Sequence, residues 1–255
     1  MPALRRVTKQ IAYAAGTGLV LFSLLLLIIL PQLAGLLRRP APPLPKQSII
    51  VESVDTVLHE QAVDAVARIR NPNPRDGIAR YTVVFVLENE LQTEISRIPV
   101  ETYLLPGNVR YVAILNVPRP DGLRRIRVET PAEPDFTSVP DSELVPSFNS
   151  FLRDRTRKVI GSQPVEEQHG IVTNRSRVGY GTVDLIGVAF DSSDRVVGIS
   201  QTFIGELLVA EPREFTLQWP EPAVATERVI VIPTTNIFNR ANIIGPRGDP
   251  SRLRE

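Results

Sequence analysis

The feature that most constrains this chain is an uncharged apolar run from Ile11 to Leu30. At about 1.5 Å per residue, a helix of this length spans about 30 Å, the thickness of the hydrocarbon core of a bilayer. Backbone groups in lipid need partners within their own segment, so the run predicts a transmembrane helix, which we place at residues 11–37. The alternative, a cleaved signal peptide, has a shorter apolar core of about 7–15 residues and a small-residue cleavage site. No convincing site of that kind follows the run, and we therefore expect an uncleaved anchor.

The charges on either side of the run do not decide its orientation. Three basic residues precede it and three follow it closely, so the positive-inside count is nearly tied. The size of the flanking parts favours a cytoplasmic tail at residues 1–10, because a short basic tail is easily retained while a large C-terminal part is exported. We therefore predict a single-pass protein of the cell membrane with extracytoplasmic C-terminal domains. The lipid bilayer is the expected partner of residues 11–37.

The rest of the chain predicts an all-β fold. Residues 38–47 contain closely spaced prolines, which are typical of an extended stalk. Short runs rich in β-branched residues then alternate with polar turns, a pattern that fits two Ig-like or fibronectin-like β-sandwiches. The runs align as an internal repeat with an offset of roughly 103 residues. We place β-sandwich domain 1 at 48–129, a linker at 130–154, β-sandwich domain 2 at 155–240 and a C-terminal tail at 241–255.

Several short motifs give the two modules a family resemblance. Asn71-Pro72-Asn73 follows a short strand and precedes a longer one, and it resembles the NPN signature of the LEA14 and water-stress (WHy) β-sandwich family. The second module resembles the FxLYD type of Ig-like domain through GIVTN at 170–174, VAFD at 188–191, VVG at 196–198 and EPREFTLQW at 211–219. Tandem modules of this kind behind one transmembrane helix are similar to single-pass membrane proteins of candidate-phylum bacteria. The resemblance implies non-catalytic modules.

No constellation of residues points to a reaction. The two histidines, His59 and His169, lie far apart in different modules, whereas a zinc site needs several ligands that converge. Asp191 and Asp194 offer oxygens to calcium, but a hairpin turn explains the DSSD run better because Asp and Ser are turn formers. Trp219 ends a strand with apolar residues at period two, so we expect it in a core or at its rim. We therefore expect no catalytic, cofactor-binding or metal-binding residue, no cofactor and no enzymatic activity.

Other conspicuous residues also have structural explanations. Asn71 and Asn174 occupy matched positions in the repeat, where a side-chain amide can bond nearby backbone. We interpret the densest basic cluster as a solvated interdomain turn, with contact to anionic lipid or to the acidic linker as the alternative. This cluster consists of Arg153, Arg155, Arg157 and Lys158. We interpret the tripeptide at 247–249, Arg-Gly-Asp, as a coincidence.

Composition narrows the classes of partner and function. A net charge of +1 and a pI near 8.1 leave no broad basic field, so we expect no nucleic acid. The chain has no cysteine, which excludes disulfides and thiol nucleophiles. We predict a membrane-anchored, extracytoplasmic, non-catalytic interaction or scaffold protein of the cell envelope, with an envelope protein as its partner. The alternative is a LEA14-like protein that protects against dehydration or envelope stress.

Overall fold

The computed structural model describes residues 45–139, 145–222 and 224–245, together with the isolated helical positions Ser23 and Leu27. The chain separates into two compact units, Met1–Pro45 and Lys46–Glu255. Apart from those two isolated positions, the predicted cytoplasmic tail and transmembrane helix lie outside the described residues. Within the described part of the chain, no helix is long and apolar enough to cross a membrane.

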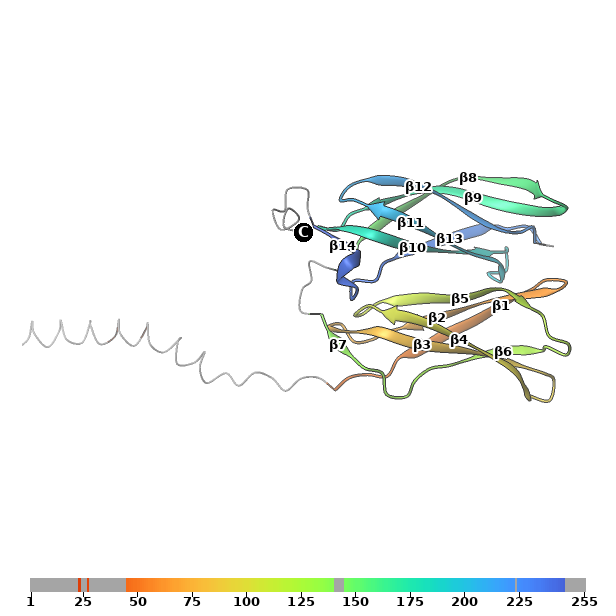
Figure 1. The fold of residues 1–255 in the computed structure, drawn as a ribbon, viewed down its shortest axis with the longest axis horizontal. Coiled ribbons are helices and arrows are strands. Elements are labelled where there is room, and N and C mark those ends of the chain that lie inside the picture. Colours follow the sequence, from red (N-terminus) through yellow and green to blue (C-terminus); the bar gives the residue numbers. More distant parts are fainter. Residues whose placement is uncertain (1–22, 24–26, 28–44, 140–144, 223, 246–255) are drawn as a thin grey trace, which may run out of the picture. The chain divides into compact units, whose positions relative to one another are not determined.

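Seven strands form the first half of the second unit. They are β1 (Ile50–Leu58), β2 (Ala62–Arg70), β3 (Asp76–Glu88), β4 (Glu94–Leu104), β5 (Val109–Pro118), β6 (Arg125–Glu129) and β7 (Thr137–Ser138). One antiparallel sheet has the order β1-β2-β5, and the other has the order β4-β3-β6, with β7 paired to the beginning of β3. The two sheets lie as neighbouring layers in Figure 1, which gives this half a β-sandwich-like arrangement.

The second half has the same arrangement, strand for strand. Its elements are β8 (Phe148–Ile160), β9 (Gln163–Asn174), β10 (Gly179–Phe190), β11 (Val196–Leu207), β12 (Pro212–Pro220), β13 (Arg228–Thr234), the 3-10 helix η2 (Arg240–Asn242) and β14 (Ile243–Ile244). The sheets are β8-β9-β12 and β11-β10-β13, and the short β14 pairs with the beginning of β10 as β7 does with β3. We refer to residues 46–139 as module 1 and to residues 145–245 as module 2.

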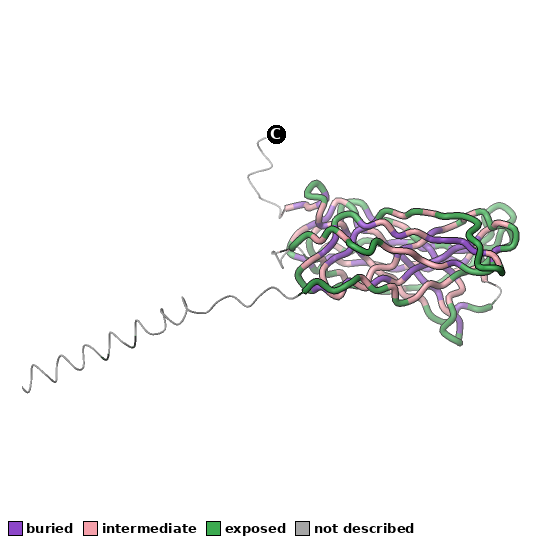
Figure 2. Tube along the Cα trace, turned by 90° about the horizontal axis from the view of Figure 1, so that it is seen from below, coloured by how far each residue is buried: buried purple, intermediate pink, exposed green. Residues whose placement is uncertain are grey.

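The strands form because their side chains alternate between a core and the opposite face. In β2, Val63, Ala65, Ala67 and Ile69 are fully buried in the core of module 1. A separate core in module 2 includes Leu185, Leu217 and Trp219. Figure 2 shows that the buried positions run along the middle of the strands, while the exposed positions concentrate in the connections and at the surface. All-β structure, predicted from the alternating pattern, is confirmed for the described part of the second unit.

The two modules pack face to face through a third apolar layer. The outer face of the sheet β1-β2-β5 meets the outer face of the sheet β11-β10-β13, and Figure 1 shows the resulting stack of four sheets. Val66 of β2 and Tyr111 of β5 contribute from module 1, and Ile186, Val188 and Ile232 contribute from module 2. Because apolar burial is the dominant favourable term in association, this layer fixes the modules to each other.

A polar contact closes one end of the layer between the modules. The Arg110 guanidinium lies 3.8 Å from the centroid of the Tyr103 ring. It donates a hydrogen bond to the Thr234 hydroxyl and pairs with the Asp184 carboxylate at 3.5 Å. Burial raises the pKa of Tyr103 to about 12, so its phenol stays neutral even near pH 10, where an exposed tyrosine would be half ionised.

The two matched asparagines hold equivalent connections. The Asn71 side chain donates to the carbonyl oxygens of Asp76 and Leu105, at 2.8 and 2.9 Å, and accepts from the amide of Asn73 at 3.0 Å. Asn174 donates to the carbonyl oxygens of Val178 and Leu207, at 2.8 and 3.2 Å, and accepts from the Ser176 amide at 2.9 Å. The Asn71 side chain thus joins the β2–β3 connection to the end of the β3–β4 hairpin in module 1. The Asn174 side chain joins the β9–β10 connection to the end of the β10–β11 hairpin in module 2.

The module boundaries differ from those expected at three places. The predicted linker, 130–154, contains β7 and the first half of β8, which begins at Phe148. There, Phe148 and Leu152 pack against the core of module 2, a short apolar alternation that the surrounding proline and acid content obscured. The predicted tail at 241–255 contributes to η2 and β14 before the described residues end.

Candidate functional site

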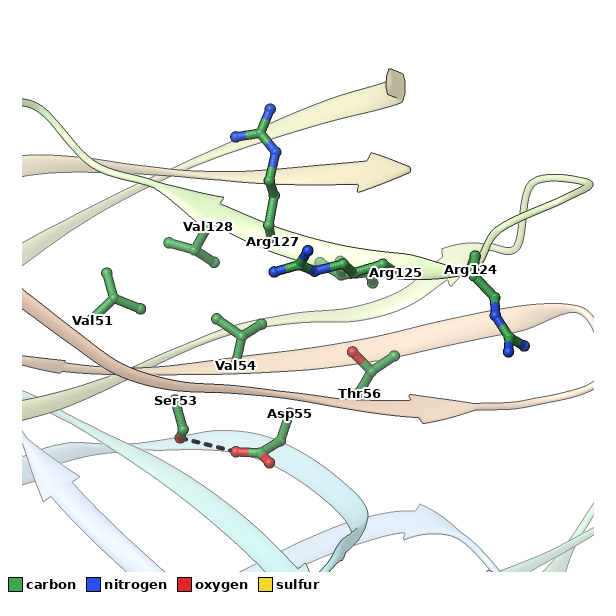
Figure 3. Close-up of a pocket in the computed structure, with 10 residues that line it drawn as sticks. Val51, Ser53, Val54, Asp55, Thr56, Arg124, Arg125, Arg127 and Val128 are labelled. Atoms are coloured by element: carbon green, nitrogen blue, oxygen red, sulfur yellow. Dashed lines mark hydrogen bonds between the residues drawn. The ribbon is translucent and has the colours of Figure 1, made fainter. Parts of the chain in front are cut away.

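Module 1 has a cleft between β1 and β6, the strands at the same side of its two sheets (Figure 3). The cleft has a volume of about 610 Å³, within the range of about 300–1,000 Å³ that is typical of binding sites. Val51 and Val54 of β1 and Val128 of β6 supply its apolar surface. Arg124, Arg125 and Arg127 supply its basic surface. We call this the β1–β6 cleft.

The cleft exists because neither strand has a partner on the side that faces it. In the described part of the chain, β6 pairs only with β3, and β1 pairs only with β2. No backbone pairing joins β1 to β6 there, although they are neighbours in space. The ladder between β1 and β2 also shifts register between Val51 and Ser53, an irregularity that bends the edge of β1.

The three arginines of the cleft differ in how their charge is used. Arg127 Nε donates to Glu88 at 2.5 Å, and the same guanidinium bonds Glu129. The hydrogen bonds to Glu129 and Glu88 raise the pKa of Arg127 above its ordinary value. The side chains of Arg124 and Arg125 have no ion pair or hydrogen bond with another described residue. Figure 3 shows both side chains extending from the β6 side of the cleft.

The opposite wall offers little charge to balance these arginines. Asp55 is the acid that lines the cleft from β1, and its carboxylate accepts a hydrogen bond of 3.0 Å from the Ser53 hydroxyl (Figure 3). Thr56 is exposed beside it. The cleft therefore combines an apolar surface, two free strand edges and two cations whose charge no described side chain neutralises.

The histidines singled out from the sequence lie in separate modules. His59 Nε2 is 2.8 Å from a carboxylate oxygen of Asp64. His169 lies on β9, where its ring nitrogens contact the hydroxyls of Thr216 at 3.1 Å and Thr156 at 3.4 Å. Among the residues that the structure describes, no group of three or more His, Cys, Asp or Glu side chains is placed to hold a metal ion.

The DSSD run forms the hairpin turn between β10 and β11. One Asp191 oxygen accepts from the backbone amides of Ser193 at 2.8 Å and Arg195 at 3.0 Å. These bonds, with that from the Arg195 amide foremost, lower the pKa of Asp191. Asp194 adopts a positive φ of 57° and pairs with Arg228 at 2.8 Å. The Asp191 carboxylate oxygens are thus engaged by the turn and by Arg195 itself.

The sequence did not suggest the buried acid beneath Trp219. Trp219 is buried in the core of module 2, and its Nε1 donates to Glu166 at 3.1 Å. The same Glu166 oxygen accepts from the Thr226 hydroxyl at 2.7 Å, and the other oxygen lies 3.5 Å from Arg157. Glu166 is only 2% exposed. Its partners lie far along the chain, so no local pattern identifies it.

The basic cluster at 153–158 lies on the edge strand β8 and is mostly paired. Arg153 contacts Glu214 at 2.7 Å, and Lys158 contacts Glu167 at 2.6 Å. The expected interdomain turn is therefore a strand whose cations are bound to acids of β9 and β12. The Arg-Gly-Asp tripeptide at 247–249 lies outside the described residues.

Comparisons with known proteins add little to this geometry. No family model matches the chain, and no curated protein matches it. Among solved structures, the chain matches the crystal structure of red sea bream transglutaminase at 11% sequence identity, with a TM-score of 0.23. The match covers 76% of this chain and 30% of that chain, so this chain spans less than a third of the length of the transglutaminase. At this TM-score the likeness carries no inference about fold or activity.

Proposed function

We propose that this protein is a membrane-anchored, non-catalytic interaction protein of the cell envelope. Residues 11–37 cross the bilayer once, the N-terminus is cytoplasmic, and the two modules are extracytoplasmic. The observation that carries the proposal is the stacking of the modules around a buried apolar layer, which holds the β1–β6 cleft on a fixed body. A pre-organised surface binds a partner at a lower entropic cost than a surface on two modules that move relative to each other.

The fold that we propose for each module is an Ig-like or fibronectin-like sandwich related to LEA14/WHy and FxLYD domains. The strand orders β1-β2-β5 and β4-β3-β6 support it, because the first, second and fifth strands form one sheet and the third, fourth and sixth form the sheet packed on it. The buried bonds of Asn71 give a physical reason for the NPN signature, since only an amide both donates to two carbonyls and accepts from an amide there. Sandwiches of this kind serve many functions, so the site must carry the functional argument.

The topology can be tested with single cysteines, because the natural chain has none. Leu91, at the tip of the β3–β4 hairpin, is 85% exposed and suits a Leu91→Cys variant. Thr8→Cys, in the predicted cytoplasmic tail, is the matched control. We expect a membrane-impermeant maleimide to label Leu91→Cys in cells whose outer barrier has been selectively opened, and to label Thr8→Cys only after lysis. The reverse pattern would refute the proposed orientation.

The interaction role can be tested by photo-crosslinking in the same cells. A photoreactive phenylalanine analogue at Thr56, inside the cleft, should give a discrete crosslinked product with an envelope protein. The same analogue at Arg213, which lies on β12 of module 2, is the control. Equal crosslinking from both positions would contradict a specific site. Loss of survival on drying in a deletion strain, with no discrete product from Thr56, would favour the dehydration-protective alternative.

A further inference from the structure

We infer that the β1–β6 cleft receives an extended acidic segment of a partner protein, which adds to the free edge of β6 as a new strand. This inference rests on the proposed function, because it names the chemistry of the partner for the same site. It follows from three independent observations: the unpaired strand edges, the two unneutralised arginines, and the apolar surface between them.

The unpaired edges are suited to a strand. β6 pairs with β3 from Arg125 opposite Glu88 to Glu129 opposite Val84, and its other edge faces the cleft. A strand placed beside β6 would lie about 4.8 Å away and would satisfy the free amides and carbonyls of that edge. β1 forms the other wall of the cleft. An added strand would thus extend the sheet β4-β3-β6 to four main strands.

The duplication within the chain supplies an internal comparison for the charges. Arg125 lies opposite Glu88 at the start of β6, and Arg228 lies opposite Phe190 at the start of β13, so the two arginines occupy matching positions. Arg228 pairs with Asp194 at 2.8 Å, and its guanidinium lies 4.2 Å from the centroid of the Phe190 ring. Arg125 has neither kind of contact among the described residues. Arg228 is therefore engaged within module 2, whereas Arg125 of module 1 is available to a ligand.

The third observation indicates the pattern of the incoming segment. The side chains of an extended peptide alternate between two faces. One face would lie against Val51, Val54 and Val128, and the other would approach Arg124 and Arg125. Because an arginine fork matches a carboxylate, alternating acidic and apolar residues suit both surfaces. A lipid headgroup could satisfy the charges, but it would leave the strand edges and the valines without partners.

The inference can be tested with the full-length protein in nanodiscs of zwitterionic lipid. The probe is a fluorescent eight-residue peptide of alternating glutamate and valine, and the readout is fluorescence anisotropy. We expect saturable binding, and we expect Arg124→Gln/Arg125→Gln to weaken it about tenfold, as loss of two charge-assisted contacts implies. The control variant is Arg80→Gln, which removes an exposed cation that pairs with Glu101 away from the cleft. Neither Arg124 nor Arg125 forms an ion pair or a side-chain hydrogen bond with another described residue, so circular dichroism should show an unchanged fold.

Two further probes separate strand addition from attraction between charges. A peptide of the same sequence that is N-methylated at alternate residues keeps its charge but cannot pair with β6, and we expect it to bind at least tenfold more weakly, an order of magnitude typical of lost backbone hydrogen bonds. A lysine–valine peptide should not bind. Equal binding of the methylated peptide, equal binding of the lysine peptide, or an unaffected double arginine variant would each overturn the inference. Binding to phosphatidylglycerol vesicles through Arg124 and Arg125, without peptide binding, would also overturn it in favour of lipid.

Failure of the inference and failure of the proposed function are distinguishable. If the peptide does not bind but the Thr56 crosslink to an envelope protein persists, the interaction role stands and the chemistry assigned to the partner is wrong. If the peptide binds but single-cysteine labelling places the modules in the cytoplasm, the cleft is assigned correctly and the proposed localisation is wrong.

Discussion

Replacing Asn71 with alanine tests how the connections within module 1 are held in place. The Asn71 side chain is fully buried and makes three hydrogen bonds to backbone groups of Asp76, Leu105 and Asn73. Alanine would leave those buried groups without these partners. At about 1 kcal/mol for each bond, with an added penalty for the orphaned carbonyls, Asn71→Ala should lower the free energy of unfolding by about 3–4 kcal/mol. This is a large part of the roughly 5–15 kcal/mol that stabilises an ordinary domain.

Denaturant unfolding followed by circular dichroism measures this loss. Asn174→Ala, which breaks the matching set of bonds in module 2, should have an effect of similar size. The control is Asn149→Ala on the edge strand β8, where the side chain is exposed and should contribute within about 0.5 kcal/mol. A loss of less than about 1 kcal/mol for Asn71→Ala would mean that water or a local shift replaces the amide, and the hydrogen-bond argument would be refuted.

Three other changes test the packing and the contact between the modules. A Cβ at Gly187 would lie 2.5 Å from Leu217 Cδ1, so Gly187→Ala should cost about 1–3 kcal/mol in thermal unfolding, whereas Gly205→Ala, which meets open space, should be close to neutral. Val188→Asp places a charge in the buried layer between the modules, and it should split a single denaturation transition into two; a transition that remains single would contradict the role of that layer. Burial raises the pKa of Tyr103 from 10.0 to about 12, so the phenol ionises at lower pH in the unfolded chain than in the folded protein. The free energy of unfolding should therefore fall as the pH rises from 10 toward 12. Tyr103→Phe should remove up to about 3 kcal/mol of this fall, measured by denaturant titration at each pH.

Local patterns were sufficient for the strands and for the roles of several single residues. Alternation along β2 and β12 predicts which side chains enter a core, because a strand exposes its two faces in turn. The structural role expected for Asn71 and Asn174 is confirmed by their backbone hydrogen bonds. The hairpin turn expected at Asp191 is likewise confirmed. The transmembrane helix at 11–37 stays a prediction, since it depends on residues outside the described part.

The candidate site could not be predicted in the same way, because it depends on which charges are already neutralised. β1 and β6 are separated by four other strands in the chain, and they form a cleft only because the two sheets leave the same side open. Arg124, Arg125 and Arg127 are equivalent in the sequence, yet the acids Glu88 and Glu129 engage only Arg127. Long-range ion pairs of this kind have no signature within a short window of sequence.

The covered face of module 2, in contrast, does have a signature. The segment VDLIGVAF in β10 is apolar on both faces, which is expected for a strand that is covered on both sides. The matching strand of module 1, β3, also has Val84 and Val86 on its outer face but ends there with Glu88, and β6 alternates Arg and apolar residues. The repeat therefore diverged where one copy had to bury its outer face against the other. β13 keeps a cation at Arg228, but Asp194 pairs with it, whereas the matching Arg125 of β6 has no such partner among the described residues. The cation that a partner can reach therefore lies in module 1.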